Sequence, residues 1–161
     1  MTAGEASSLN DGAAALLVAS ETAIKRGPFR PLARALGFSP AGVRPRLMGL
    51  GPVPAVQKLL ARFELAVADV SVIELNEAFA PHSLARLRSL GIADDAEHVH
   101  PNGGAIALGH PPGTSGARLA GFAVQELHDC QGRFGLATMC VGVGQGAALL
   151  VERCLAVRTL L

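Results

Sequence analysis

The stretch "VADVSVIELNEAFA", residues 67–80, changes its pattern at its midpoint. Its first half is rich in β-branched residues and predicts a buried strand that ends at Leu75. We expect a helix to follow from Glu77 through Leu90. A strand that passes directly into a helix is typical of an α/β domain.

The rest of the chain repeats this alternation. The expected strands are Gly12–Ser20, Arg30–Phe38, Phe134–Cys140 and Ala147–Leu155, and the further expected helices are Glu21–Arg26, one that starts at Pro54, and Gly113–Cys130. A long Gly/Pro-rich connection, residues 39–54, separates the second strand from its helix. We therefore predict an α/β fold with a mixed central sheet, helices on both faces and a terminal β-hairpin.

Composition limits the kinds of function that the chain can have. It has 161 residues, of which 50% are hydrophobic and 17% charged, and this fits one globular domain. Its net charge of +1 is scattered, so we expect no nucleic-acid partner and no membrane surface. The N-terminal residues lack the features of a signal peptide, and no apolar run is long enough to span a bilayer, so we expect a cytoplasmic protein with a small-molecule site. Three cysteines are an odd number, which argues against a disulfide framework.

Asn76 lies where the strand gives way to the helix. Its side chain can cap that helix, which is the ordinary role of an asparagine at such a point. It can also hold a water or a substrate oxygen, because an amide offers both a donor and an acceptor. Local sequence leaves both interpretations open.

His110 lies in "HPNGGAIALGHPPGTSGARL", residues 100–119, between Gly109 and a pair of prolines. An isolated histidine is most often a surface or core residue. Here the glycines allow close approach of the backbone to a ligand, and the prolines fix the loop ahead of a helix. Because imidazole transfers protons near neutral pH, this context favours a general base.

Cys140 ends an expected strand and precedes "VGVGQG", residues 141–146. A cysteine at a strand end is commonly only a packing residue. The glycines that follow would place its thiol beside free backbone N–H groups that can hold an oxyanion. One cysteine and one histidine do not make a zinc site, so we expect no metal.

Three segments in this order, "NEAFA", "NGGAIALGHPPGTSGAR" and "CVGVGQG", resemble the signature blocks of thiolases, which cleave or form 3-oxoacyl-CoA thioesters. The stretches "TAGEASSLNDGAAALLVAS" and "MGLGPVPA" are similar to thiolase sequences as well. The resemblance therefore covers nearly the whole chain and implies the fold of a thiolase C-terminal half. The details look most like the degradative enzymes that act on 3-oxoadipyl-CoA, with CoA and acyl-CoA as substrates and no bound cofactor.

The resemblance assigns roles to six residues. It makes His110 the residue that activates the nucleophilic cysteine and helps to form an oxyanion hole. It makes Cys140 the second cysteine, which shuttles a proton to and from the α-carbon or the departing CoA thiol. Asn76 would hold a catalytic water, and Gly142 would donate its N–H to the acyl-enzyme oxyanion. The two residues that match positions lining the pantetheine tunnel are Ala78 and Phe79.

Two residues depart from the family pattern in the loop that must orient His110. His100 stands where the family usually has asparagine, and Pro112 stands where it has leucine or isoleucine. Neither change removes a catalytic group, but both affect the loop that carries the base.

A larger difference concerns the first half of a thiolase, which carries the acyl-accepting cysteine and which this chain does not match. No cysteine precedes Cys130, so we expect residues 1–161 to be a C-terminal domain that needs an N-terminal half as partner and is inactive alone. We also expect self-association into a homo-oligomer. The alternative is a non-catalytic acyl-CoA-binding or assembly module, but such a module would need none of the proton-transfer groups Asn76, His110 and Cys140.

Overall fold

The computed structural model describes residues 2–155. Its centre is a four-stranded mixed sheet in the order β1-β4-β3-β2. The strands are β1 (Ala33–Gly42), β2 (Val70–Leu75), β3 (Phe134–Cys140) and β4 (Gln145–Arg153). β4 runs antiparallel to both of its neighbours and forms the expected hairpin with β3, whereas β2 runs parallel to β3.

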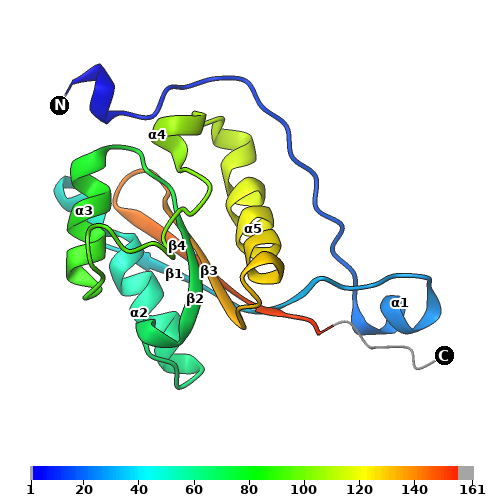
Figure 1. The fold of residues 1–161 in the computed structure, drawn as a ribbon. Helices are drawn as coiled ribbons and strands as arrows, with labels where there is room; N and C mark the ends of the chain where they lie inside the picture. Colours follow the sequence, from blue (N-terminus) through cyan, green and yellow to red (C-terminus); the bar gives the residue numbers. More distant parts are fainter. Residues whose placement is uncertain (1, 156–161) are drawn as a thin grey trace.

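Helices cover both faces of this sheet, as Figure 1 shows. The helices α2 and α3 lie on one side and α5 on the other, and the chain's N-terminal segment passes over α4 and α5. The α-helices are α1 (Glu21–Arg26), α2 (Pro52–Arg62), α3 (Ala80–Ser89), α4 (Ala105–Leu108) and α5 (Pro112–Asp129), and the 3₁₀ turns are Ala3–Glu5, Pro45–Leu50 and Val67–Asp69. No helix within residues 2–155 is long and apolar enough to cross a membrane.

The core lies on both faces because side chains of a strand alternate between them. Ile73 and Leu75 pack with Leu59 of α2 in the larger cluster, whereas Val72 packs with Leu127 of α5 in the smaller one. Burial of one such leucine contributes roughly 2 kcal/mol to stability. β2 is thus buried from both sides, which explains its nearly continuous apolar sequence.

Several sequence expectations are confirmed. α1 has the predicted bounds, and α5 spans 112–129 against the expected 113–130. α2 begins two residues earlier than expected, at Pro52, which is tolerated in a first helical turn because no helical partner exists there for an N–H. Its expected apolar face, including Val56 and Leu60, is buried.

The expected strand over residues 12–20 is wrong. This segment is extended and almost wholly exposed, and it pairs with no strand of the described residues. Its small apolar side chains fit a strand, but the segment lies along α5, where the Thr114 hydroxyl donates to the Gly12 carbonyl at 2.6 Å, and so it does not reach a strand with which to form a ladder. The expected strand over 30–38 is displaced to Ala33–Gly42 and continues through Pro40, which is tolerated because β1 is an edge strand.

Two further differences concern helices. α3 begins at Ala80 and not at Glu77, because residues 76–79 form an irregular bend after β2. The short helix α4 and the turn Pro45–Leu50 were not expected, since both lie in Gly/Pro-rich sequence that favours loops.

Candidate functional site

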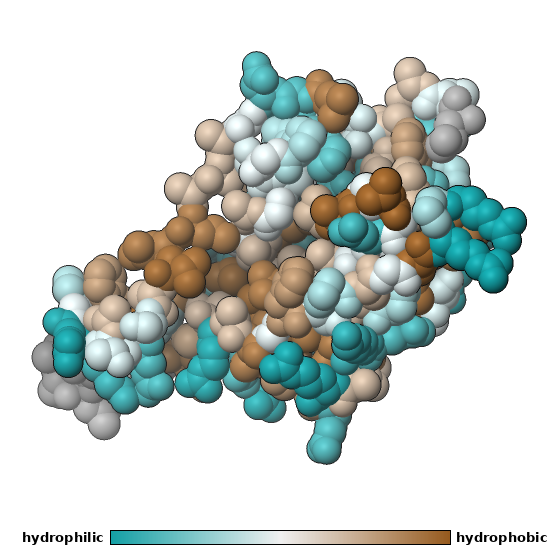
Figure 2. All heavy atoms as spheres, turned by 180° about the vertical axis from the view of Figure 1, so that it is seen from behind, coloured by the Kyte–Doolittle hydropathy of each residue, from teal (hydrophilic) through white to brown (hydrophobic). Residues whose placement is uncertain are grey.

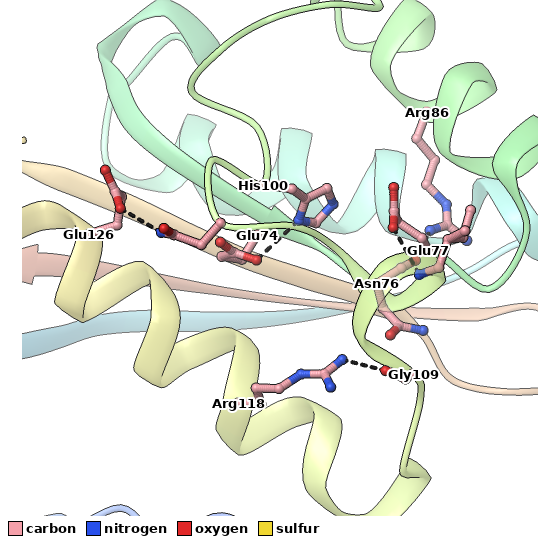
Figure 3. A network of polar contacts seen from close by, with 10 residues as sticks. Glu74, Asn76, Glu77, Arg86, His100, Gly109, Arg118 and Glu126 are labelled. Atoms are coloured by element: carbon pink, nitrogen blue, oxygen red, sulfur yellow. Dashed lines mark hydrogen bonds and ion pairs between the residues drawn. The ribbon is translucent and has the colours of Figure 1, made fainter. Parts of the chain in front are cut away.

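Asn76 is almost completely buried at the end of β2. Its backbone N–H donates to the Thr138 carbonyl of β3 at 2.9 Å, so the sheet fixes its position. The capping interpretation is wrong, because Phe79 occupies the N-cap of α3 and no side chain caps that helix. The Asn76 Oδ1 accepts no hydrogen bond in the structure. Figure 3 shows the Asn76 amide on the side of its backbone that faces Arg118 and Gly109.

His110 lies between α4 and α5, and its ring is held by Ser115. The Nδ1 atom lies 2.7 Å from Ser115 Oγ, which in turn donates its proton to the Pro111 carbonyl at 3.0 Å. Because the hydroxyl has only one proton, it accepts from Nδ1–H of the imidazole. This assignment from the hydrogen-bond network leaves the lone pair on Nε2, as a general base requires.

The protonation state of His110 agrees with that role. Burial lowers the pKa of His110, and the positive charge of Arg118 lowers it further. The imidazole is therefore neutral at pH 7, since its ordinary pKa of about 6.5 already lies below that pH.

The backbone around His110 is fixed from several sides. Gly109 has φ of 88°, and a Cβ on it would lie 2.3 Å from the Asn10 amide oxygen, so the position requires glycine. Arg118 of α5 donates to the Gly109 carbonyl at 2.8 Å (Figure 3). The His110 N–H donates to Ser8 at 2.7 Å, so the N-terminal segment also holds the loop.

Glu77 holds the loop at α4. Its Oε2 accepts from the Ile106 N–H at 3.0 Å, and thereby caps α4 (Figure 3). A Cβ on Gly104 would lie 2.1 Å from this carboxylate, so only glycine leaves room for it. Sequence analysis missed this role of Glu77, although the "NE" pair beside a strand end was visible.

The structure accommodates both departures from the family pattern. His100 adopts φ of 49°, a left-handed conformation in which asparagine and histidine are both enriched. Its Nδ1 lies 3.0 Å from Glu74 Oε2, and both side chains are more than nine-tenths buried. Pro112 opens α5, where its missing N–H is not needed.

Cys140 is a half-buried free cysteine at the end of β3. The turn after it is closed by hydrogen bonds of 2.9 Å from Val141 N to Gln145 O and from Gln145 N to Gly142 O. Gly142 is exposed, with φ of 51°, and its N–H donates to no backbone group of the described residues.

Arg86 of α3 is a fully buried residue that sequence analysis missed. Its Nε donates to the Gly49 carbonyl, and its Nη1 donates to the Asn76 carbonyl at 2.7 Å (Figure 3). Burial lowers the pKa of Arg86, whereas interaction with Cys140 raises it. A signal was present, because residues 83, 86, 87 and 90 share one helical face that carries two leucines.

Ala78 and Phe79 lie beside the N-terminal segment. The Ala78 carbonyl accepts from Ser7 N–H at 3.3 Å, and Phe79 meets the ring of His82 edge to face at 5.2 Å between centroids.

The structure thus forms two polar groups of residues, one around Asn76, Arg86 and Cys140, and one around His110 and Ser115. No hydrogen bond joins His110 to Asn76 or Cys140 in the part of the chain that is described. Within residues 2–155, no group of three or more His, Cys, Asp or Glu side chains is arranged to hold a metal ion.

Comparison with known proteins confirms the resemblance seen in the sequence. The family model described as "Thiolase, C-terminal domain" matches residues 29–153. The beta-ketoadipyl-CoA thiolase of Pseudomonas aeruginosa is 63% identical over 153 residues, which are 95% of this chain and 38% of that protein. The 3-oxoadipyl-CoA/3-oxo-5,6-dehydrosuberyl-CoA thiolase of Escherichia coli is 60% identical, with the same coverage.

Solved structures agree in fold. Human mitochondrial 3-ketoacyl-CoA thiolase in complex with CoA matches with a TM-score of 0.91 and 44% identity, over 96% of this chain and 39% of that one. Acetyl-CoA acetyltransferase from Bacillus anthracis matches with a TM-score of 0.90 and 43% identity, over 95% of this chain and 38% of that one. The chain spans 38% of the length of the curated relatives named above. By its sequence blocks, its fold and these matches, the chain belongs to the thiolase family and carries the family's C-terminal domain.

Proposed function

We propose that this chain supplies the proton-transfer half of a thiolase active site, which transfers an acyl group between a 3-oxoacyl-CoA and CoA. The observation that carries the proposal is the Ser115–His110 contact, because it leaves Nε2 of a neutral imidazole free to accept a proton. The nucleophilic cysteine would come from an N-terminal half.

The proposed reaction begins when His110 Nε2 takes the proton of that cysteine. The resulting thiolate attacks the 3-oxo carbonyl, and the bond between the α- and β-carbons breaks. The Cys140 thiol then gives its proton to the α-carbon, which releases acetyl-CoA and leaves a Cys140 thiolate. This thiolate takes the proton of an incoming CoA thiol, and the CoA sulfur attacks the acyl-enzyme. The nucleophilic cysteine leaves as a thiolate and takes back the proton held on His110, which completes the transfer.

The remaining site residues stabilise charge and position groups in this scheme. The exposed Gly142 N–H would donate to the oxyanion of the acyl-enzyme. Asn76 would hold a water with its side-chain oxygen, which accepts no hydrogen bond within the described structure. Ala78 and Phe79 would line the path of the pantetheine arm.

We propose a 3-oxoadipyl-CoA type of substrate, because the relatives at 60% and 63% identity are named for that activity. CoA as second substrate agrees with the human thiolase structure, which is a complex with CoA. The expected cytoplasmic location stays a prediction that cell fractionation would test.

An apolar groove beside α5 supports docking of an N-terminal half. It has a volume of about 160 Å³, and its lining includes Phe38, Leu119, Met139 and Leu149. Phe38 is 56% exposed, and further exposed apolar residues occur in the segment 16–18. Figure 2 shows hydrophobic side chains gathered in clusters on the face seen from behind. Because large apolar patches are rare on monomers, we expect this surface to be covered by a partner half or by self-association.

Complementation tests the proposed function. The chain alone should show no CoA-dependent cleavage of 3-oxoadipyl-CoA, whereas co-expression with the N-terminal 60% or so of a bacterial relative should restore it. Within that complex, His110→Ala and Cys140→Ser should each lower kcat by roughly two to four orders of magnitude. Cys130→Ser, which alters an exposed cysteine, is the matched control and should leave kcat unchanged.

Two results would contradict the proposal. Turnover by the chain alone would show that no second half is needed. A soluble complex that binds CoA without turnover would favour the non-catalytic acyl-CoA-binding module.

A further inference from the structure

Arg86 is a buried cation without a carboxylate partner. It is completely inaccessible to solvent, and no ion pair of the described residues includes it. Its two hydrogen-bond acceptors are backbone carbonyls of Gly49 and Asn76, and its Nη2 has no partner. Since burial of an uncompensated charge is costly, the position calls for an electrostatic explanation.

The sheet geometry places Cys140 on the side from which Arg86 approaches. Phe134 and Leu136 of β3 face the core cluster that contains residues of α2 and α3. Because strand side chains alternate, Cys140 projects from that same face at the end of the strand. Arg86 Nη1 donates to the Asn76 carbonyl at 2.7 Å, and the Asn76 N–H donates to Thr138, two residues before Cys140 on this face, so the guanidinium lies near the end of β3. Interaction with the Cys140 side chain raises the pKa of Arg86, against the larger lowering by burial.

The charge of Arg86 also acts on another neighbour. His82, four residues earlier on α3, has its pKa lowered first by burial and then by the positive charge of Arg86. The guanidinium therefore exerts a positive potential on ionisable groups around it, and the Cys140 thiol is a group that can become an anion.

We propose that Arg86 is a positioning residue that stabilises the thiolate form of Cys140 and, through the Asn76 carbonyl, fixes the bend after β2. The inference rests on the proposed function, in which the Cys140 S–H bond breaks and its proton forms a C–H bond at the α-carbon. The electron pair of the S–H bond stays on sulfur, and the guanidinium offsets its negative charge until the CoA thiol returns a proton. No other reactant is required.

Charge-selective alkylation tests this proposal without any turnover. Iodoacetate is an anion and iodoacetamide is neutral, and both react with the thiolate. The ratio of their two rates at one cysteine therefore does not depend on the fraction of thiolate, and it depends little on how accessible the sulfur is. Mass spectrometry reports the ratio separately for Cys140 and for the exposed Cys130 of the same chain. We expect the iodoacetate to iodoacetamide ratio at Cys140 to exceed that at Cys130 by about fivefold at low salt, as a nearby positive charge requires.

Substitutions then assign the potential to one side chain. Arg86→Gln should reduce the ratio at Cys140 to that at Cys130, and Arg86→Lys, which keeps the charge, should retain most of it. Arg88→Gln is the matched control, because Arg88 is an exposed arginine of the same helix that pairs with Asp94. It should change nothing at Cys140. Arg86→Met replaces the charge with an apolar chain if the glutamine variant does not fold.

Equal iodoacetate to iodoacetamide ratios at Cys140 and Cys130 in the unaltered chain would overturn the proposal, and this result needs no variant. A folded Arg86→Gln or Arg86→Met chain that keeps the high ratio would overturn it as well. Both outcomes are independent of complementation, so failure of the alkylation test and failure of the thiolase assay can be told apart.

Discussion

Replacement of Ser115 by alanine tests whether the hydroxyl sets the tautomer of His110. Ser115 is fully buried in the first turn of α5, and its Oγ lies 2.7 Å from Nδ1. Ser115→Ala removes the acceptor of Nδ1–H and leaves that donor without a partner. The tautomer with its proton on Nδ1 is then less stable, and the population of rings with a free Nε2 falls.

The magnitude follows from the cost of an unpaired buried donor, which is about 1–3 kcal/mol. Since 1.36 kcal/mol corresponds to a factor of ten, kcat should fall roughly 5- to 150-fold in the complemented enzyme. Ser89→Ala is the matched control, because Ser89 makes the same type of bond, from its Oγ to the carbonyl four residues earlier, on an exposed face of α3. It should change kcat by less than twofold.

Two measurements check this prediction. The kcat of the complemented enzyme gives the functional effect, and ¹⁵N NMR of the His110 ring gives the tautomer in the chain alone. In the unaltered chain, Nδ1 should carry the proton. An Nε2-protonated ring in the unaltered chain, or an unchanged kcat in Ser115→Ala, would refute the reasoning.

Three further predictions concern the same loop. NMR titration should give His110 a pKa below 6.5, and Arg118→Gln should raise that pKa. Because the pKa is lower in the folded chain than in the unfolded chain, the stability linked to His110 is complete above about pH 6.5 and is lost as the pH falls through the folded value, and urea unfolding at pH 5 and pH 7.5 would check this. Gly109→Ala should lower the free energy of unfolding by more than about 1 kcal/mol, whereas Gly113→Ala, where a Cβ meets nothing, should change it by about 0.5 kcal/mol or less; equal effects would contradict this. His100→Leu should cost about 1–3 kcal/mol in the same assay because it removes the hydrogen-bond partner of a buried carboxylate on β2, while His100→Asn should cost less, and equal losses in the two variants would remove the role of this hydrogen bond.

The parts of the fold that the sequence predicted are those with a strong local signal. β2, the hairpin of β3 and β4, and α5 have continuous apolar or periodic sequences bounded by glycine or polar residues. Residues 12–20 have a comparable apolar sequence, yet they form no strand. A strand needs a neighbouring strand, and no local pattern shows that this segment lies along α5 and not beside β1.

The candidate site also contains residues with a local sequence signal and residues without one. His110 and Cys140 could be singled out because prolines or glycines surround them in the sequence. The partners Ser115 and Arg118 of His110 lie within one helical turn or two, but their contacts depend on how the loop enters α5. The helical face of Arg86 indicated its burial, but its role could not be predicted, because its acceptor Gly49 comes from a distant part of the chain.

The loop that carries His110 shows how a residue can depart from its family without loss of geometry. Its first residue, His100, occupies a left-handed position and pairs with the buried Glu74 of β2, so the sheet fixes where the loop begins. Glu77 fixes its middle at α4, and Arg118 fixes the carbonyl next to His110. An asparagine at position 100 would satisfy the same backbone conformation and could hydrogen-bond the same carboxylate. The histidine therefore keeps the anchor at the start of the loop, while the direction of His110 is set independently by Ser115 and Gly109.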